Sequence, residues 1–342
     1  MATIKDVARE AGVSIGTVSK ALNGSYTISE EQTRRVKQIA EQLGYKANAR
    51  AQTFARQASR SAVFLTALPK GAAFENPHMF EIICGAESAL REKGYTLALK
   101  HCDAKNICHA AKETMASKSA DGILFHASVV TKELAAMLGR EEIPHIIIGK
   151  PAFPNSVCWI DNDNRLSGEI AARHLAELGH TEIAFVGGLE EDKISEDRLA
   201  GVESELRSRP QPNESNLCAV YKGESTIAEG KRAGLEILAL AKRPHAVICA
   251  NNYLAYGCLR ALQWQNVRVP DDVSLVTFDD YPFALFMNPA LTTVSIDVYD
   301  MGVQAGKLLV SKIKKPGMRV QSFTTLPLLV KRQSTTEIKR CY

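Results

Sequence analysis

A short stretch near the N-terminus carries polar side chains at the spacing of one helical face. Its members are Ile15, Gly16, Thr17, Ser19, Lys20 and Asn23, preceded by Ser14. Apart from Ile15 they are small or polar, so this face can enter the major groove of a DNA duplex. The ammonium group of Lys20 can then donate to base edges, while hydroxyl groups reach phosphate oxygens. Helix pairs are common, and by spacing alone a purely structural pair remains the alternative.

Three short helices are expected to position this face. Thr3 and Asp6 form a capping-box pattern that opens the first helix, and Gly12 ends it because glycine accepts the left-handed conformation of a helix C-terminus. A second helix is expected over 14–23, and a third, opened by another capping box, over 29–43. The expected inward side chains are Ile4, Val7, Ala8, Ala11, Val18, Ala21, Leu22, Val36, Ile39, Ala40 and Leu43. These three helices make a helix-turn-helix headpiece.

The distribution of charge supports contact between this headpiece and a nucleic acid. Residues 1–60 hold ten Lys and Arg against five Asp and Glu, whereas the other 282 residues hold 32 against 33. The excess positive charge therefore lies in the first sixth of the chain. A basic head on a neutral body is typical of a protein whose head contacts DNA phosphates.

Several classes of protein are not supported by the sequence. Apolar runs are too short to span a bilayer, and the N-terminus has no apolar segment of a secretory signal, so we expect a cytoplasmic protein without membrane contact. The eight cysteines include no CxxC pair and are expected to be free thiols in a reducing cytosol, without a metal site. No phosphate-binding glycine loop, GxSxG or HExxH motif occurs, so neither a cofactor nor enzymatic activity is expected.

Apolar strand-like runs alternate with amphipathic helical stretches from residue 61 onward. The expected strands are Val63–Leu68, Thr96–Lys100, Gly122–His126, Ile146–Gly149, Val157–Ile160, Ile183–Val186, Leu217–Tyr221, Ala246–Cys249, Val273–Phe278 and Leu291–Ile296. The expected helices include Met79–Lys93, Ser167–Leu178, Ser225–Ala241 and Leu254–Gln265. Such alternation predicts parallel sheets covered by helices on both faces. The expected fold class is therefore an all-α headpiece followed by an α/β body of two doubly wound parallel-sheet lobes, with ligand bound in the cleft between them.

The chain resembles the lactose-repressor family along essentially its whole length. In the headpiece the resemblance lies in ATIKDVAREAGVSIGTVSKALNG, YTISEEQTRRV and LGYKANARA, and in the body it includes WIDNDNRLSGEIAARHLAELGHTEIAFVGG, DRLAGVESEL, VRVPDDVSLVTFDDYPFA and PALTTVSIDVYDMG. The resemblance implies a repressor that binds double-stranded operator DNA as a homodimer. It also implies a body of the type found in periplasmic sugar-binding proteins.

The resemblance places candidate DNA contacts at particular positions. Ile15, Gly16 and Lys20 match positions that read bases, and Tyr45 matches a tyrosine that contacts phosphate. Phe54 matches a hinge position whose side chain enters the minor groove, where an apolar wedge bends the duplex. Packing of Phe54 on the body is the alternative. The full candidate set is Thr3, Ser14, Ile15, Gly16, Thr17, Ser19, Lys20, Asn23, Tyr45, Asn48, Ala51, Gln52 and Phe54, with Ala47 replacing the proline usual before the hinge.

The resemblance also predicts the domain boundaries. The expected divisions are the headpiece 1–46, the hinge 47–60 and the body 61–342, with lobe 1 over about 61–159 and 292–323 and lobe 2 over about 160–291 and 324–342. The chain is expected to cross between lobes near 157–161, 289–294 and 322–327. It ends soon after the last strand without a heptad helix, so a dimer is expected rather than a tetramer.

Candidate effector contacts follow from the same comparison of positions. Arg198 and Asp279 match residues that hold effector oxygens, since a guanidinium fork and a carboxylate suit hydroxyl or carboxylate groups. Asp161 is a candidate contact or equally an interlobe cap. The remaining candidates are His78, Met79 and Ser225, with Asn251 and Asn252, like Asp161, as weaker ones. His78 donates to an effector oxygen or simply caps its helix.

The departures from the family pattern bear on the kind of effector. His78, Met79 and Ser225 stand where aromatic residues are usual, so we expect a cavity poor in rings that suits a sugar or sugar phosphate better than a flat purine. Asn252, where an acid is usual, favours an anionic ligand slightly. The rivals to a repressor are a solute-binding protein, disfavoured by the basic head, and an enzyme, disfavoured by the missing motifs.

Overall fold

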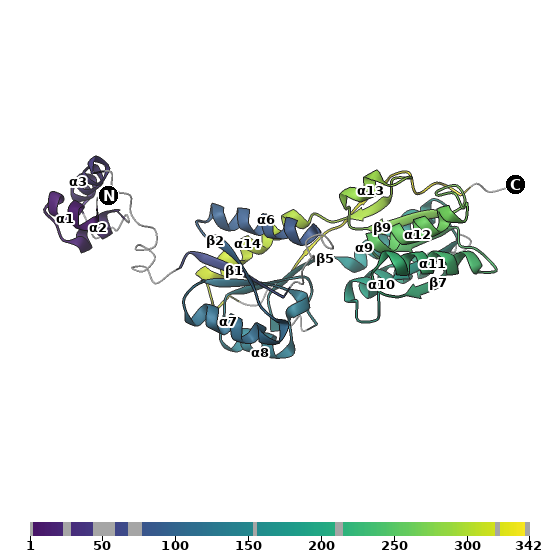
Figure 1. Ribbon diagram of the computed structural model, residues 1–342, viewed down its shortest axis with the longest axis horizontal. Helices are drawn as coiled ribbons and strands as arrows, with labels where there is room; N and C mark the ends of the chain where they lie inside the picture. Colours follow the sequence, from purple (N-terminus) through teal and green to yellow (C-terminus); the bar gives the residue numbers. More distant parts are fainter. Residues whose placement is uncertain are drawn as a thin grey trace.

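The structure is a computed structural model that describes residues 3–22, 29–43, 59–67, 77–152, 156–208, 215–318 and 322–338. Within these ranges no helix is both long and apolar enough to span a bilayer. Three short helices stand apart from a body of two lobes, each built around a parallel sheet (Figure 1). The expected fold class is confirmed.

The headpiece consists of α1 (Ile4–Ala11), α2 (Ile15–Leu22) and α3 (Glu30–Gln42). The caps are those expected from the sequence. The Thr3 N–H donates to Asp6 Oδ2 at 2.9 Å, and Gly12 ends α1 at a φ of 66°. Ser14 Oγ accepts the Thr17 N–H at 3.1 Å, which fixes the start of α2. A side chain that caps a helix in this way contributes about 1 kcal/mol.

The headpiece has a small apolar core of its own. Its buried side chains are Val7, Ala8, Ala11, Val18, Ala21, Val36 and Ala40, all of them expected. Leu43 is an exception, because it is exposed although its spacing predicted an inward position. The reason is that α3 ends at Gln42, so Leu43 is the cap residue and no longer follows the helical period.

Lobe 1 is a six-stranded sheet with the strand order β11-β5-β4-β3-β1-β2. Its strands are β1 (Ser61–Thr66), β2 (Thr96–His101), β3 (Gly122–His126), β4 (His145–Ile148), β5 (Trp159–Asn162) and β11 (Ser322–Thr325). Its helices are α6 (Pro77–Glu92), η1 (Ala104–Asn106), α7 (Ile107–Ala116), η2 (Ala127–Val129), α8 (Lys132–Arg140) and α14 (Val298–Lys314). Alternate residues of β1 face opposite layers: Ala62 and Phe64 pack with the α6 and α14 side, and Val63 and Leu65 with the α7 and α8 side.

Lobe 2 repeats this plan with the strand order β12-β10-β9-β8-β6-β7. Its strands are β6 (Glu182–Gly187), β7 (Asn216–Lys222), β8 (Ala246–Cys249), β9 (Ser274–Phe278), β10 (Thr292–Ser295) and β12 (Leu328–Val330). Its helices are α9 (Asn164–Glu177), α10 (Lys193–Arg207), α11 (Ile227–Ala239), α12 (Asn252–Trp264) and α13 (Pro282–Phe286). Among the described strands of this lobe, only β12 pairs antiparallel, with β10.

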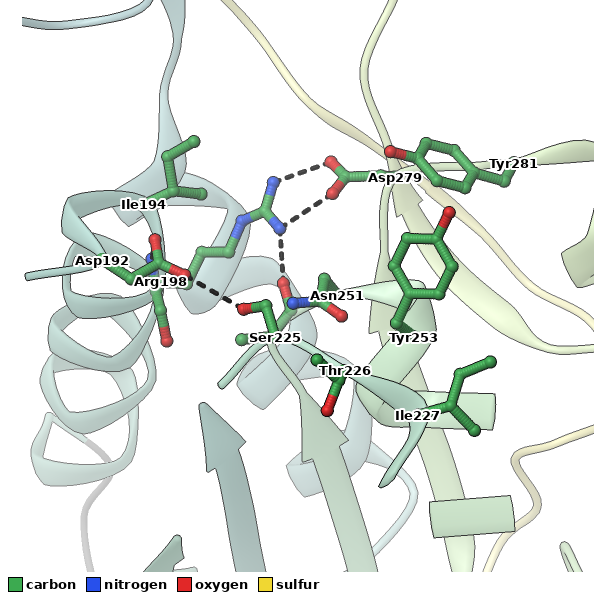
Figure 2. A pocket seen from close by; sticks show the side chains of 12 residues that line it. Asp192, Ile194, Arg198, Ser225, Thr226, Ile227, Asn251, Tyr253, Asp279 and Tyr281 are labelled. Atoms are coloured by element: carbon green, nitrogen blue, oxygen red, sulfur yellow. Dashed lines mark hydrogen bonds and ion pairs between the residues drawn. The ribbon is translucent and has the colours of Figure 1, made fainter. Parts of the chain in front are cut away.

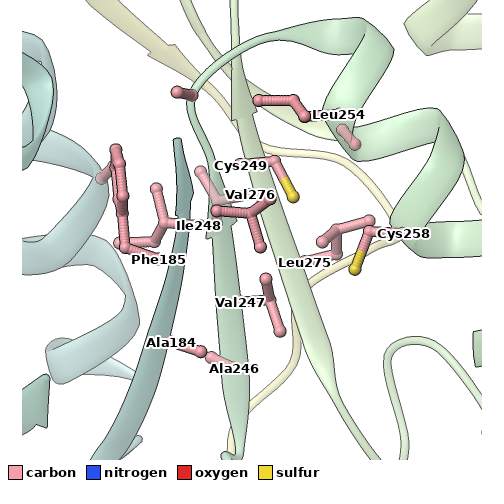
Figure 3. Packing of buried hydrophobic residues seen from close by; sticks show 14 of the residues in the cluster. Ala184, Phe185, Ala246, Val247, Ile248, Cys249, Leu254, Cys258, Leu275 and Val276 are labelled. Atoms are coloured by element: carbon pink, nitrogen blue, oxygen red, sulfur yellow. The ribbon is translucent and has the colours of Figure 1, made fainter. Parts of the chain in front are cut away.

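The central strands of lobe 2 are apolar on both faces. Figure 3 shows Phe185, Ile248 and Val276 on β6, β8 and β9, with Leu254 and Cys258 of α12 against the same sheet. Strands buried on both faces lose the alternation of polar and apolar residues, which explains their continuous apolar runs. Each fully buried side chain of this size contributes about 1.5–3 kcal/mol.

The chain crosses between the lobes after β5, after β10 and after β11. The first two crossings come a few residues later than the sequence predicted. Trp159–Asn162 completes the lobe 1 sheet beside β4, and Thr292–Ser295 pairs with β9 in lobe 2. The expected boundary after residue 159 therefore cuts through β5, and the expected boundary before residue 292 precedes β10. The short strands β11 and β12 were not among the expected strands.

Each lobe contains a pair of helices that pack closely at a glycine, and the pair in lobe 2 positions Arg198. A Cβ at Gly168 of α9 would lie 1.9 Å from the Arg198 carbonyl oxygen of α10. In lobe 1 a Cβ at Gly85 of α6 would lie 2.1 Å from the Tyr299 carbonyl oxygen of α14. Only glycine permits such an approach of two helix backbones. The glycine at 168 thus lets the helix that carries Arg198 pack closely on its neighbour.

Candidate functional site

A cavity of about 630 Å³ lies in lobe 2 at the carboxyl ends of four neighbouring strands (Figure 2). Its lining follows the strands in turn: Asp192, Ile194, Ser195 and Arg198 after β6; Ser225, Thr226 and Ile227 after β7; Ala250, Asn251 and Tyr253 after β8; and Asp279 and Tyr281 after β9. After β6 the chain adds β7 on one side of it and then β8, β9 and β10 on the other, so the order of strand addition reverses between β6 and β8. Ligands of doubly wound sheets bind at this reversal, outside the carboxyl ends of the strands.

Arg198 and Asp279 form the charged centre of the cavity. Arg198 is only 3% exposed and donates from Nη2 to Asp279 Oδ1 at 2.7 Å and from Nη1 to Asp279 Oδ2 at 3.1 Å. Its Nη1 also donates to the Ala250 carbonyl oxygen at 2.6 Å, and its Nε to Asn164 Oδ1 at 3.1 Å. The guanidinium group lies 4.5 Å from the centre of the Phe278 ring. Most of its donors are therefore engaged within the protein, and Arg198 both lines the cavity and holds its wall.

Arg198 favours the ionised form of Asp279. Burial raises the free energy of the ionised Asp279 carboxylate, but the charge and hydrogen bonds of Arg198 outweigh that effect and place the Asp279 pKa below its ordinary value. Asp279 adopts a φ of 63°, a conformation that aspartate tolerates better than most residues. Asn252 Nδ2 donates to the Asp279 carbonyl oxygen, which secures this turn from the start of α12.

Asp192 is a cavity residue that the sequence did not single out. It is the N-cap of α10, because its Oδ1 accepts the Ser195 N–H at 3.1 Å. Its Oδ2 lies 3.4 Å from Ser225 Oγ, on the side that faces the cavity in Figure 2. Ser225 thus lines the cavity as expected. An acidic residue just before a helix is an ordinary capping residue, so nothing in the sequence marked Asp192 as a ligand contact.

The expectation of a cavity poor in rings is wrong. Tyr253 and Tyr281 both line it, with ring centres 6.5 Å apart and planes at 79°. Tyr253 is the second residue of α12 and Tyr281 precedes α13, and neither stands at the family positions that were compared. The nearly perpendicular planes do not form a parallel clamp around a flat ring.

The two residues expected at the start of α6 behave differently from each other. His78 meets lobe 2, because its ring centre lies 4.3 Å from that of Tyr281 in an edge-to-face contact. Burial lowers the His78 pKa, although Asp279 partly opposes this effect. Met79 is 4% exposed and packs in the core of lobe 1. Neither residue belongs to the lining of the lobe 2 cavity, and the two point in different directions because one residue along a helix turns the side chain by about 100°.

A second cavity of about 320 Å³ lies between the lobes. Lobe 1 contributes the end of β3, the segments after β3 and β4, and Asp161 of β5, whereas lobe 2 contributes Asn164 of α9, the turn before α10 and the first residues of α10. Asp161 lines it and accepts the Lys150 N–H at 2.9 Å and the Asn162 N–H at 2.8 Å. Burial raises the Asp161 pKa, and these two bonds oppose the effect. An ion pair of 3.5 Å joins Lys150 Nζ to Asp197 Oδ2 across the cleft.

The structure describes part of the expected DNA-binding set. Thr3 and Ser14 serve as caps at the starts of α1 and α2. Ile15 is 45% exposed at the first position of α2, beside Gly16 and Thr17. Ser19 and Lys20 lie on the same helix. The expected contacts at Asn23, Tyr45, Asn48, Ala51, Gln52 and Phe54 lie outside the described residues.

The described ranges contain no group of three or more His, Cys, Asp or Glu side chains placed to hold a metal ion. The seven cysteines in the same ranges are free thiols. The described residues provide hydrogen-bonding and charged groups in lobe 2 and in the cleft. In the headpiece they provide the exposed start of α2.

Two family profiles match the chain. One, described as bacterial regulatory proteins of the lacI family, matches residues 3–48, and one described as a periplasmic binding protein-like domain matches residues 172–335. Among curated proteins, the HTH-type transcriptional repressor PurR of Vibrio campbellii (strain ATCC BAA-1116) is 31% identical and covers 99% of this chain and 100% of its own. The probable HTH-type transcriptional repressor ExuR of Bacillus subtilis (strain 168) is 30% identical, with 94% of both chains covered.

Solved structures agree with this assignment. The transcriptional regulator CelR in complex with cellobiose has a TM-score of 0.70 and 27% identity, and covers 98% of this chain and 100% of its own. The lac repressor dimer bound to operator and the anti-inducer ONPF has a TM-score of 0.77 and 22% identity, with 98% and 99% covered. At that identity the second likeness concerns the fold alone.

Proposed function

The chain belongs to the lacI family of bacterial regulatory proteins, and from that premise we propose that it represses transcription as a homodimer on a pseudo-palindromic operator, under the control of a small sugar-like effector. It is a DNA-binding transcription regulator with an effector-binding body, and its relatives are named as repressors, not enzymes. One observation carries the proposal. The same chain joins a helix-turn-helix headpiece, in which α2 begins at the exposed Ile15, to a lobe that contains a cavity of about 630 Å³ lined by charged and hydroxyl-bearing side chains.

The control of operator affinity follows from the arrangement of the lobes. The hinge at 47–60 joins the headpiece to lobe 1, whereas most polar groups of the effector cavity belong to lobe 2. An effector that contacts both lobes stabilises one arrangement of lobes over another and changes the spacing of the two hinges in a dimer. The coupling can be no larger than the difference in effector affinity between the two states, typically 1–3 kcal/mol.

Exposed apolar side chains support a homodimer. Phe80 is 62% exposed on α6, and Phe283, Leu285 and Phe286 are all more than half exposed on the short helix α13. Large apolar residues gathered on one short element indicate a surface that another chain covers. Sedimentation velocity tests this directly. Phe286→Asp is expected to shift the protein from dimer to monomer, while Trp264→Asp, an exposed aromatic residue at the end of α12, leaves the dimer intact.

The ligands bound in related structures favour a sugar as effector. CelR was solved with cellobiose, and another LacI-family regulator of Enterococcus faecium with ribose. The cavity of this chain offers carboxylate, amide and hydroxyl groups beside two tyrosine rings, the mixture that suits a molecule with many hydroxyl groups. The perpendicular tyrosines do not favour a stacked flat base.

The experiment that tests the function is selection of bound sequences from random DNA with full-length protein, with and without sugars. Enrichment of a palindrome with two half-sites is the expected result. Lys20→Ala is expected to change the preferred bases within each half-site, whereas Lys37→Ala on α3 leaves them unchanged. No enrichment under any condition would contradict operator binding, and a single unrepeated half-site would contradict the dimer.

A further inference from the structure

We propose that Asp192 determines effector specificity, so that the two cavities together select an uncharged, hydroxyl-rich molecule and exclude its phosphorylated or carboxylated forms. This inference rests on the proposed function and narrows the class of effector. Asp192 lines both the lobe 2 cavity and the interlobe cavity, as does Ile194. An effector that extends from one cavity into the other therefore passes this carboxylate.

The hydrogen bonds of Asp192 leave one oxygen available. Oδ1 accepts the Ser195 N–H at 3.1 Å and so caps α10. Oδ2 has a single long contact, 3.4 Å from Ser225 Oγ. An ionised carboxylate oxygen accepts two hydrogen bonds and has none to donate. Oδ2 can therefore accept a hydroxyl hydrogen from an effector, and it offers nothing to a phosphate or carboxylate oxygen.

The charges around Asp192 point to the same class of ligand. Within the described residues, the two cavities are lined by five carboxylates, Asp161, Glu191, Asp192, Asp197 and Asp279, and by three cations, Lys150, Lys193 and Arg198. Each cation already has a carboxylate partner: Arg198 pairs with Asp279, and both lysines pair with Asp197. Asp161 and Asp192 have no cation within 4 Å in the part of the chain that the structure describes.

An anionic effector would therefore meet repulsion without a free cation to offset it. Two like charges a few ångströms apart in a partly buried cleft repel each other, because the low dielectric there screens them less than bulk water does. An uncharged sugar escapes that cost and gains charge-assisted hydrogen bonds, which are stronger than neutral ones. Ile194, Ile227 and Tyr253 supply apolar surface for the carbon skeleton of the same molecule.

The alternative is that Asp192 serves only as the cap of α10. The variant Asp192→Asn separates the two roles, because asparagine caps a helix as well as aspartate does but carries no charge. Asp163→Asn is the matched control. Asp163 caps α9 through the Leu166 N–H at 2.9 Å and lines neither cavity.

The test is calorimetric titration of the full-length wild-type protein and both variants with matched ligand pairs: cellobiose and cellobionate, D-glucose and glucose 6-phosphate, and D-ribose and ribose 5-phosphate. Wild type is expected to bind an uncharged member at least about tenfold more tightly than its anionic partner. Asp192→Asn is expected to lose about tenfold in affinity for the uncharged member, the size expected for one hydrogen bond to a charged group, and to narrow the difference within the pair. Asp163→Asn should match wild type.

Two results would overturn the inference and leave the proposed function standing. One is tighter binding of the anionic member of a pair by wild type. The other is an Asp192→Asn profile equal to that of Asp163→Asn. If no sugar of either kind binds while operator binding persists, the sugar-like effector of the proposed function is itself contradicted, and the role of Asp192 falls with it.

Discussion

The two lobes share one topology but differ in what stands at the carboxyl ends of their strands. Each has a six-stranded sheet with the same order of connections, and each has a tightly packed helix pair that meets at glycine. At this end lobe 2 presents the buried Arg198–Asp279 pair and a cavity of about 630 Å³. Lobe 1 presents mainly small and apolar residues, and Asp161 there is bonded to backbone N–H groups.

This difference between the lobes shows which features come from the shared fold and which come from the side chains of the site. The fold supplies the same crevice twice, because it follows from strand order and helix packing. Among the described residues, the Arg198–Asp279 pair and the larger cavity belong to lobe 2, where segments that follow four strands converge. We therefore interpret lobe 2 as the lobe that grips the effector and lobe 1 as the surface that closes over it.

The largest expected effect comes from removing Arg198. Arg198→Ala leaves Asp279 without its counter-ion in the wall of lobe 2, and loss of one partner of a buried pair costs about 3–5 kcal/mol. The free energy of unfolding should fall by that amount in chemical denaturation, and effector response should disappear. Arg165→Ala is the control, since Arg165 is exposed and pairs only loosely with Glu169, so a change within about 0.5 kcal/mol is expected. Equal effects of the two variants would contradict the special status of the pair.

The glycine contacts should be alike in both lobes, in contrast to the charged site. Gly168→Ala and Gly85→Ala each place a Cβ about 2 Å from a backbone carbonyl oxygen of the facing helix. The helices must then separate, at a cost of about 1–3 kcal/mol each. Thermal unfolding measures both. Gly168→Ala should also weaken effector binding because it displaces the helix that carries Arg198, whereas Gly85→Ala should not. A smaller loss of effector affinity for Gly168→Ala than for Gly85→Ala would contradict the placement of the effector site beside α10.

Low pH should destabilise the packing of residues 333–338 against lobe 2. His174 bonds to Thr335 Oγ1 at 3.0 Å and His180 to the Thr336 carbonyl oxygen at 2.9 Å, and burial lowers the pKa of both histidines to about 4. Because each pKa lies below the unfolded value of about 6.5, the folded state binds fewer protons in this range. Stability is therefore full above pH 6.5 and falls as the pH drops from 6.5 to 4.

Hydrogen exchange at residues 333–338, followed from pH 7 to pH 4 with correction for intrinsic rates, measures this loss. His180→Gln should flatten the dependence of protection on pH. His109→Gln, which replaces an exposed histidine of lobe 1, should leave it unchanged. Protection that stays constant down to pH 4 in wild type would contradict the assignment.

The smallest expected effect compares two threonine caps. Thr131 Oγ1 accepts the Leu134 N–H at 3.1 Å in lobe 1, and Thr226 Oγ1 accepts the Glu229 N–H at 3.2 Å in lobe 2. Replacing either by alanine should cost about 1 kcal/mol in the free energy of unfolding. Only Thr226 lines the effector cavity, so only Thr226→Ala should also alter effector affinity in calorimetry. Equal effects of the two variants on effector affinity would contradict the assignment of effector binding to lobe 2.

Features set by neighbouring residues could be predicted from the sequence. The cap of α1 at Thr3, the cap of α3 at Ser29 and the apolar strands of both sheets depend on spacing over a few positions. The strands β11 and β12 were missed, because they have only four and three residues and both are partly exposed. Their pairing depends on strands more than 30 residues away.

The site was predicted only in part, for a related reason. Arg198, Asp279 and Ser225 line the cavity as the resemblance implied. Asp192 and Tyr281 reach it through turns whose proximity depends on the whole sheet, so neither had a local signal. Met79 could not be distinguished from His78 by sequence, since the phase of α6 against lobe 1 decides which of two adjacent side chains is buried.

Hydrogen exchange of the full-length protein with and without cellobiose or D-ribose, whichever binds more tightly, tests the central claim most directly. If lobe 2 grips the effector, protection should rise most at 192–198, 250–253 and 279–281, and less at 126–128 and 149–150 in lobe 1. Protection that rises mainly in lobe 1, with the three lobe 2 segments unchanged, would contradict the account.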